Sequence, residues 1–461
     1  MNASIVLRAM LPEHLLLLGI VLLVLLEIAG RRDRAPLIVA LASVGCAAAA
    51  AAGLSLAGFA ASPFAGHFSV EPAGLMAKAM VLALALPVLM MSRDDFAGGE
   101  FPILLLASLY GACLMQSSDS VPTLFLGLEI LSLPVYVLVL LAYRRPQSAE
   151  AALKYLVLGG AASATFLMGA SLLYGATGSM ATATFSAAIG SGDALARAAV
   201  VLVLLAFFLK AAIVPFHAWA PDAYEGASVP VTAYMATIVK AAIVLAVVRL
   251  VGPATFTPPL LALVAGLPLL SVLWGNLAAM RQASLRRTIG YSSIAHAGYL
   301  LLSLLGDPAG RLQAVAFYLL AYGLLNLLAL AALPAAADDA ARDRLDNLKG
   351  LYHRAPFAAL MVGMSMLSLA GVPPFPGFVA KFLIFRNVVA AGHPAVALLG
   401  LLGSYLGLYF YLRVIQFMFM SADTPVALER PARGLVLGAS VACLVATGWL
   451  VLFPGWVIAA F

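Results

Sequence analysis

Long apolar segments alternate with short polar ones along the whole chain. Each apolar segment ends at charged residues, Pro or Gly, and most approach the roughly 20 residues that a membrane helix needs. The pattern predicts fourteen membrane spans, at residues 13–30, 36–58, 72–92, 102–116, 121–142, 149–175, 197–213, 229–250, 258–279, 288–306, 310–334, 356–391, 395–421 and 434–459. We therefore expect an all-α polytopic membrane protein that forms a single integral membrane domain, residues 1–461.

The composition supports a membrane protein and excludes several other classes. Of the 461 residues, 64% are apolar and 10% are charged, whereas a soluble domain carries about 25% charged residues. Cys46, Cys113 and Cys443 are scattered through apolar runs without a Cys-x-x-Cys pattern, so neither a disulfide framework nor an iron–sulfur or other metal site is indicated. The net charge of +6 does not indicate nucleic-acid binding, because no basic cluster contains interleaved aromatic residues.

The basic residues between the predicted spans are concentrated on one side. Fifteen follow odd-numbered spans: Arg31, Arg32, Arg34, Arg93, Arg144, Arg145, Arg281, Arg286, Arg287, Arg342, Arg344, Lys349, Arg354, Arg430 and Arg433. The other side has only Arg8, Arg197 and Arg311. The positive-inside rule then places the fifteen in the cytoplasm and both termini outside. The first span lacks a small-residue cleavage pattern, so we expect no cleavable signal.

Eight basic residues lie inside apolar runs: Lys78, Lys154, Lys210, Lys240, Arg249, Lys381, Arg386 and Arg413. We single out Lys210 in the seventh span, Lys240 in the eighth and Lys381 in the twelfth, together with Glu129 in the fifth. A charge at the centre of a membrane helix costs about 2.5–3.5 kcal/mol, so these groups must be paired, hydrated or neutralised. One ion pair that only holds helices together is the structural alternative, but it leaves two lysines without an acidic partner at similar depth. Because the proton affinity of a buried amine depends on nearby charge, these lysines are candidate proton-exchange sites.

Prolines interrupt two of the spans. Pro215 follows Lys210, and Pro373 and Pro374 precede Lys381. Proline removes a backbone donor, and freed carbonyls at membrane depth need protein or water beside them. Broken helices in corresponding halves are typical of inverted-repeat transporters. The breaks lie five spans apart, which predicts repeats at 101–250 (spans 4–8) and 251–421 (spans 9–13), flanked by N-terminal helices at 1–100 and a C-terminal helix at 422–461.

Other polar groups leave alternatives open. His296 lies among hydroxyl and small residues in the tenth span, and it is either a packing residue or a proton relay, since imidazole titrates near neutral pH. His217, Asp222 and Glu225 match no metal-motif spacing, which favours a structured turn over a metal site. The charged segment 338–354 is a solvated linker with a short helix or a docking site for a partner.

Six segments, in order from the fifth span to the twelfth, carry a family resemblance: Leu128–Tyr136, Ser148–Gly159, Ser171–Gly178, Lys210–Ala233, Gly275–Gly298 and Leu367–Phe382. Together they resemble the antiporter-like subunits of proton-pumping NADH:quinone oxidoreductase, respiratory complex I. Tyr224-Glu225-Gly226 and Lys381 resemble subunit N rather than subunit M. Ala380, where glycine is usual, and Ala227–Pro230 depart from the pattern without replacing a titratable group.

The resemblance implies a role for each candidate residue. Glu129 and Lys210 would be the carboxylate and pump lysine, Lys240 the central relay, His296 a further relay, Lys381 the exit-side lysine and Lys154 a lysine near the first pair. Protons would move from cytoplasm to periplasm across a bacterial inner membrane, coupled to quinone reduction elsewhere in the enzyme.

The resemblance also implies which parts this chain lacks. It would hold no cofactor, metal or redox centre, while NADH, FMN, iron–sulfur clusters and quinone bind in partner subunits. Expected partners are the lipid bilayer and other membrane subunits, including M, J and K, and no nucleic acid. Two alternatives stay open: a subunit of a multisubunit cation/proton antiporter or hydrogenase-linked relative, and a structural membrane subunit without its own proton path.

Overall fold

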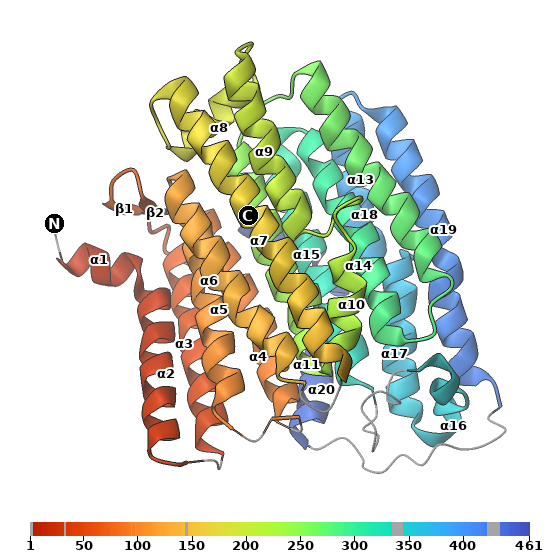
Figure 1. The fold of residues 1–461 in the computed structure, drawn as a ribbon. Coiled ribbons are helices and arrows are strands. Elements are labelled where there is room, and N and C mark those ends of the chain that lie inside the picture. Colours follow the sequence, from red (N-terminus) through yellow and green to blue (C-terminus); the bar gives the residue numbers. More distant parts are fainter. Residues whose placement is uncertain are drawn as a thin grey trace.

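Long helices lie side by side through the protein, from the red N-terminal helices at one edge to α13 and α19 at the other (Figure 1). The computed structural model describes residues 3–31, 34–93, 95–96, 98–142, 146–333, 344–421 and 434–461. Six of the fifteen predicted cytoplasmic basic residues lie outside these ranges, namely Arg32, Arg144, Arg145, Arg342, Arg430 and Arg433.

The first half of the chain contains α1 (Ala3–Ala9), α2 (Leu11–Ile28), α3 (Ala35–Leu56), α4 (Pro72–Ser92), α5 (Glu100–Gln116), α6 (Val121–Leu140), α7 (Pro146–Thr177), α8 (Thr182–Ile189), α9 (Ala194–Lys210), α10 (Trp219–Gly226), α11 (Val229–Tyr234), the π-helix η1 (Met235–Val239) and α12 (Lys240–Val251). Strands β1 (Ala61–Phe64) and β2 (Phe68–Val70) form an antiparallel hairpin between α3 and α4.

The second half contains α13 (Pro258–Ala279), α14 (Leu285–Leu302), η2 (Ser303–Leu305), α15 (Pro308–Ala331), η3 (Leu345–Leu348), α16 (Leu351–Arg354), α17 (Pro356–Ala370), α18 (Pro376–Ala390), α19 (Pro394–Phe419), α20 (Gly434–Leu452) and α21 (Pro454–Ala460).

The all-α polytopic prediction is confirmed, and the span count is only partly supported. Within the described residues, eleven helices are long and apolar enough to cross a membrane, or twelve if α8 and α9, which meet at 111°, form one span. All fourteen predicted segments overlap described helices. However, α5 and α17 have only 17 and 15 residues, so the number fourteen stays a prediction. Helix α8 was not predicted, because its residues lie between two predicted spans and were assigned to a loop.

Helices in the middle of the bundle are buried, while those at the edges present apolar side chains outward. All residues in the most apolar stretch of 229–251 are buried, and so are 94% of the residues in the most apolar stretch of α15. In contrast, Leu17 and Leu25 on α2 and Leu402 on α19 are about half exposed or more. Lipid is as apolar as leucine, so such side chains are stable at a bilayer-facing surface.

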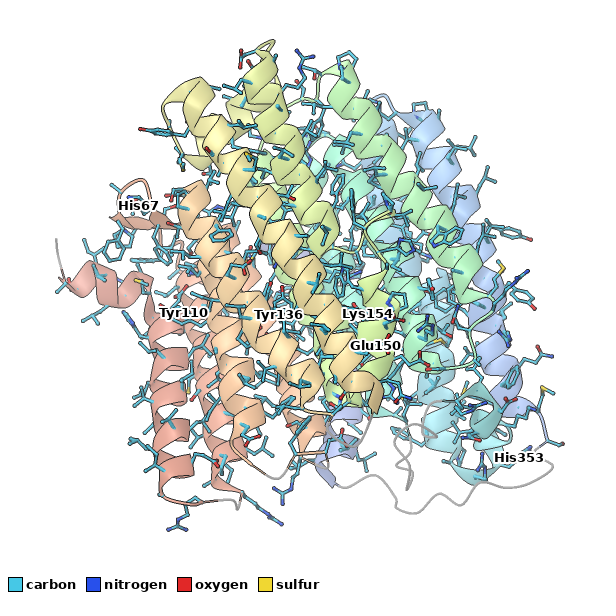
Figure 2. The ribbon with its side chains drawn as sticks, viewed as in Figure 1. His67, Tyr110, Tyr136, Glu150, Lys154 and His353 are labelled. Carbon is cyan, nitrogen blue, oxygen red and sulfur yellow. The ribbon has the colours of Figure 1, made fainter. Side chains whose placement is uncertain are left out.

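The bundle has two ends, which we name after a helix at each. The α8 end carries α8 and the β1–β2 hairpin, and the α16 end carries α16 and the α2–α3 loop (Figure 1). His67 in the hairpin and His353 in α16 mark these ends in Figure 2. The position of a residue along the bundle can be given relative to these two ends.

The first interrupted helix ends at Lys210. The chain is non-helical from there until α10 begins at Trp219, and it passes through a cis Val214–Pro215 bond. Side chains satisfy the freed backbone groups: the Trp219 indole N–H donates to the Leu209 carbonyl at 3.0 Å, and the Val214 N–H donates to the Ser271 hydroxyl at 2.8 Å. The break is therefore packed against protein, as irregular backbone at membrane depth requires.

The second interruption separates α17 from α18. Gly371 adopts a left-handed conformation with φ +90°, and a cis Pro373–Pro374 bond follows. The Gly377 N–H donates to the Ser368 hydroxyl at 3.1 Å. The last carbonyls of α17 accept instead from the side chain of Lys381, so this break and a buried charge form one structural unit.

Candidate functional site

Glu129 and Lys210 form an ion pair between α6 and α9, in which Lys210 is buried and the Glu129 side chain is 20% exposed. Lys210 Nζ lies 3.2 Å from Glu129 Oε1 and donates to the hydroxyls of Ser132 and Tyr136, each also at 3.2 Å. The Ser163 hydroxyl on α7 donates to the same Glu129 oxygen at 2.6 Å. Glu129, Ser132 and Tyr136 are spaced i, i+3 and i+7, so α6 presents all three on one face. If the carboxylate moved away, Lys210 would retain only neutral acceptors.

Lys240 is buried at the start of α12, directly after the π-helix η1. Its ammonium group donates to the carbonyl oxygen of Ser293 on α14, and the Ser293 hydroxyl bonds to that of Tyr224 at 3.0 Å. No carboxylate contacts Lys240 among the described residues. A π-turn inside a helix is frequently found at functional sites, and no pattern of residues indicated this one.

A small cavity lies between Lys210 and Lys240. Its lining includes both lysines together with Tyr155, Trp219 and Tyr224, and it measures about 10 Å³. A cavity of roughly this size can hold one water molecule if polar partners are present. The cavity therefore has room for a single water molecule.

His296 on α14 is enclosed by tyrosines of its own helix and of two others, α15 and α19. Its Nδ1 bonds to the Tyr318 hydroxyl at 2.7 Å, and its Nε2 bonds to the Tyr411 hydroxyl at 3.0 Å. The rings of Tyr299 and Tyr322 also pack against it, with centroids 5.6 Å and 4.6 Å away. Because hydroxyls both donate and accept, the imidazole has a proton partner on each side.

Lys381 fills the second helix break. Its ammonium group donates to the carbonyls of Leu369 and Ala370, each at 2.9 Å, and to the hydroxyl of Ser404 at 2.8 Å. The ring of Tyr299 lies 5.2 Å away and connects this site to the surroundings of His296. Lys381 thus resembles Lys240 in having only neutral oxygen acceptors among the described residues.

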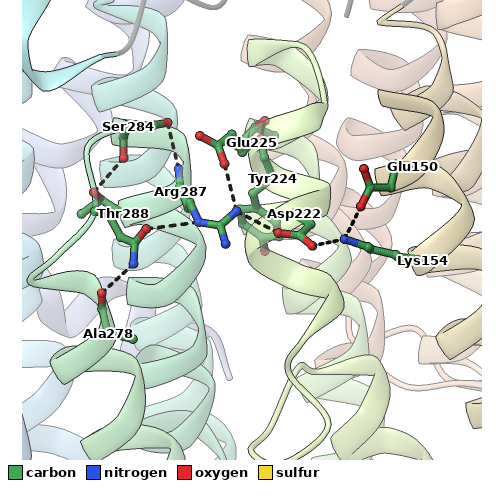
Figure 3. Close-up of polar contacts among 11 residues, drawn as sticks. Glu150, Lys154, Asp222, Tyr224, Glu225, Ala278, Ser284, Arg287 and Thr288 are labelled. Atoms are coloured by element: carbon green, nitrogen blue, oxygen red, sulfur yellow. Dashed lines mark hydrogen bonds and ion pairs between the residues drawn. The ribbon is translucent and has the colours of Figure 1, made fainter. Parts of the chain in front are cut away.

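Lys154 belongs to an ion-pair cluster rather than to the Glu129–Lys210 pair. Its ammonium group lies 2.6 Å from Glu150 and 2.7 Å from Asp222, while the Arg287 guanidinium lies 2.8 Å from Asp222 and 2.9 Å from Glu225 (Figure 3). The Lys154 side chain is 44% exposed. The cluster joins α7, α10 and α14, and Figure 2 shows Glu150 and Lys154 displaced toward the α16 end relative to His67.

Two of the three residues weighed for a metal site in the sequence have ionic partners. Asp222 and Glu225 bind Arg287, and His217 Nε2 accepts from the Trp274 indole N–H at 2.9 Å. No group of three potential metal ligands occurs in the part of the chain that the structure describes. Burial alone would raise the pKa of Asp222, but hydrogen bonds from Lys154 and Arg287 and their positive charges lower it below its usual value. Asp222 is thus a fixed negative charge.

Sequence reasoning missed a second buried ion pair. Glu13 and Lys78 lie 2.5 Å apart, and neither side chain has any exposed surface. Glu13 is the first residue of its predicted span, where a charge can reach the interface. Lys78 lies inside a predicted span, and its depth was the available signal.

Comparison with known proteins gives consistent results. The family model described as "NADH:quinone oxidoreductase/Mrp antiporter, TM" matches residues 118–407. The chain is 38% identical over 435 residues to NADH-quinone oxidoreductase subunit N of Pelobacter propionicus, covering 94% of this chain and 93% of the relative. It is 42% identical over 363 residues to NADH-quinone oxidoreductase subunit 14 of Thermus thermophilus, covering 78% and 80%.

Solved structures show the same likeness. A chain of respiratory complex I from Thermus thermophilus with bound aureothin aligns with a TM-score of 0.83 at 36% identity, covering 97% of this chain and 98% of that one. A chain of the Mrp complex from Dietzia also aligns with a TM-score of 0.83, covering 98% and 96%, but at 23% identity. The second likeness shows a shared fold.

Proposed function

The chain belongs to the subunit N branch of the NADH:quinone oxidoreductase and Mrp antiporter family, and we propose from this premise that it carries protons from cytoplasm to periplasm through its buried charges. The relay runs from Lys210 through Lys240 and His296 to Lys381. The observation that carries the proposal is the unequal pairing of the lysines. Lys210 faces the carboxylate of Glu129, whereas Lys240 and Lys381 bind only neutral oxygens in the described structure.

This difference supplies a means of driving the proton forward. A nearby carboxylate stabilises the charged form of a buried lysine, and burial without such a partner favours the neutral form. Lys210 therefore holds its proton while Glu129 stays at 3.2 Å. When Glu129 moves away, the proton leaves Lys210 through the cavity shared with Lys240.

The second half of the relay uses the tyrosines around His296. Tyr411 and Tyr318 bond to its two ring nitrogens, and Tyr299 packs against both His296 and the Lys381 ammonium. A proton that reaches Lys381 is released toward the outside. Its carbonyl partners at the break stabilise the charged form until release.

Protons are taken up at the ion-pair cluster around Lys154. The cluster contains the carboxylates of Glu150, Asp222 and Glu225, and it includes partly exposed side chains. Negative charge at the mouth of a channel raises the local concentration of cations. The α16 end then faces the cytoplasm and both termini the periplasm, with fourteen spans and inverted repeats at 101–250 and 251–421.

The relay works inside a proton-translocating NADH:quinone oxidoreductase. NADH, FMN, iron–sulfur clusters and quinone bind in partner subunits, and this chain contributes no redox centre. Quinone reduction changes the charge state of a neighbouring membrane subunit, and subunits M, J and K are the proposed neighbours. That change shifts Glu129 away from Lys210 and couples the two reactions.

The test replaces Lys210 or Lys381 by alanine in the assembled complex, reconstituted in liposomes. A group that transfers protons contributes on the order of 10²–10⁴ in rate, so flux through this subunit should become negligible. The protons moved per electron should therefore fall while the complex stays assembled. Unchanged pumping in both variants would refute the relay. Loss of assembly without a separate loss of pumping would favour a purely structural role for the charges.

A further inference from the structure

An open pocket lies at the α16 end of the bundle, between the first turns of α3 and α20 and the end of α4. It measures about 620 Å³, within the range of about 300–1,000 Å³ that is usual for ligand sites. Its lining includes two arginines, Arg34 directly before α3 and Arg93 directly after α4. No residue of this pocket belongs to the proton relay, so it is a separate feature of the protein.

The two arginines of the pocket lack an acidic partner. Neither guanidinium forms an ion pair with a carboxylate within the described ranges of the chain. Asp95, two residues after Arg93, is exposed and does not line the pocket. A guanidinium presents five N–H donors in a planar fork that matches a phosphate group. The pocket therefore offers both space and donors for a phosphate.

Below the pocket, one face of α4 is only partly covered. Over residues 77–92, every position is buried except Ala83, Leu86 and Met90. These three are spaced i, i+3 and i+7, and Arg93 follows at i+10, so all four lie on one face. Ten residues of helix span roughly 15 Å, about half the thickness of the hydrocarbon core. The uncovered face thus runs from the arginines over a length similar to one lipid leaflet.

Apolar side chains flank this face of α4. The helix packs against both α3 and α20, which lie on either side of it in Figure 1. Leu37 of α3 and Leu435 of α20 line the pocket above it. One turn further along α20, a Cβ added to Gly438 would lie 3.1 Å from Met90 Cε, so the two helices approach closely there. We call the pocket and the face formed by Ala83, Leu86 and Met90 the α4 groove.

We propose that the α4 groove binds an anionic glycerophospholipid such as phosphatidylglycerol. The phosphate lies between Arg34 and Arg93, and one acyl chain covers Ala83, Leu86 and Met90. This inference goes beyond the proton relay and does not depend on it. Basic pockets between transmembrane helices bind anionic lipid headgroups. A free phosphate would leave the apolar face uncovered, and an apolar helix of a partner would leave the two arginines without a counter-charge.

The test uses photoreactive lipids in vesicles that hold the whole complex. Phosphatidylglycerol with a diazirine on its acyl chain is compared with phosphatidylcholine that carries the same chains, and the labelled residues are identified by mass spectrometry. The proposal predicts that phosphatidylglycerol labels residues 83–90 more strongly than phosphatidylcholine does. Equal labelling by the two lipids overturns it, since the headgroup would then not be recognised. Absence of labelling by both lipids also overturns it, because another subunit would then cover the face.

Variants of the arginines test the headgroup site directly. A basic residue near a membrane surface contributes about a fivefold preference for anionic lipid. Arg93→Gln should therefore lower labelling by phosphatidylglycerol about fivefold, and adding Arg34→Gln should lower it roughly thirtyfold in total. Arg281→Gln, which removes an exposed guanidinium outside the groove, should leave the labelling unchanged. Equal labelling of the Arg93 and Arg281 variants overturns the proposal.

A second substitution keeps the test decisive if the arginine variants do not assemble. Ala83→Phe retains both arginines and fills the path of the acyl chain. Ala161→Phe is the matched control, because Ala161 is an exposed alanine on α7, away from the groove. Labelling of residues 86–90 by phosphatidylglycerol should fall only in Ala83→Phe. Equal labelling in the two variants overturns the placement of the lipid on α4.

Discussion

The ammonium group of Lys381 lies 2.9 Å from the carbonyl oxygen of Leu369, so a side chain of α18 satisfies the backbone of α17 across the second helix break. Lys210 differs, because it ends its own helix and points at Glu129. The two lysines next to the breaks therefore have different partners, one a carboxylate and the other carbonyls. Their substitution should have different consequences.

Lys381→Met should destabilise the protein measurably. It leaves the carbonyls of Leu369 and Ala370 buried without their donor, and each unsatisfied carbonyl costs about 1–3 kcal/mol of stability. Lys381→Arg, which keeps donors, should lose less. Thermal unfolding of the purified complex measures the effect, with Lys349→Met, on a partly exposed side chain, as the control. A melting temperature equal to that of the control would mean that Lys381 does not support the break.

Gly371→Ala should impair pumping because it displaces the side chain of Lys381. The residue has φ +90°, and an added Cβ would lie 3.1 Å from Lys381 Cδ. Gly392→Ala is the matched control, because Gly392 has φ +87° but open space around it. Both variants should lose about 1–2 kcal/mol of folding stability, because a residue with a Cβ is disfavoured in the left-handed conformation. Only Gly371→Ala should also lower the protons moved per electron, and equal pumping by the two would contradict the role of Lys381.

Tyr411→Phe should slow proton transfer at His296. The hydroxyl bonds to His296 Nε2 at 3.0 Å and to Ser292 at 2.5 Å, and the substitution removes both contacts. Tyr405→Phe is the control, since Tyr405 lies on the same helix with its side chain exposed. We expect a lower initial pumping rate for Tyr411→Phe in an assembled complex. Identical rates for the two variants would show that His296 is a packing residue.

Asp222→Asn should weaken proton uptake without unfolding the cluster. Because the lowered pKa of Asp222 keeps it ionised at working pH, the substitution changes the net charge of the cluster's three carboxylates and two cations from −1 to zero and weakens their attraction for cations. The loss should grow as pH rises and protons become scarce. Stability should change by at most about 1 kcal/mol, as for other partly exposed pairs. Pumping measured from pH 6 to 9 tests this. The control is Asp346→Asn, which removes an exposed carboxylate outside the cluster. Parallel profiles for the two variants would contradict the prediction.

The sequence predicted the buried lysines and the helix breaks, but it did not predict which residues contact the charged and polar groups of the site. Depth within an apolar run was enough to single out Lys210, Lys240 and Lys381, and Pro215 and Pro373 marked the interruptions. Tyr318 and Tyr411, which bond to His296, lie on other helices, so no local pattern indicates them. The same holds for Arg287, which appeared as one of several loop arginines but pairs with Asp222 and Glu225.

Other features were hidden by their position in the chain. Glu13 begins its predicted span and so resembled an interfacial charge, although its partner Lys78 lies inside another span. The π-turn before Lys240 leaves no mark in the apolar pattern, because every residue of 235–239 is buried. The lysines without carboxylate partners were nevertheless foreseen, since too few acidic residues lie at their depth.

The relay depends most directly on Lys240, the group between the two halves. The decisive measurement is the number of protons moved per electron by the reconstituted complex carrying Lys240→Met, with Lys349→Met as the control. A continuous relay predicts an assembled complex that oxidises NADH and moves fewer protons per electron than the control. An equal ratio in the two variants would contradict proton passage through this chain by way of Lys240.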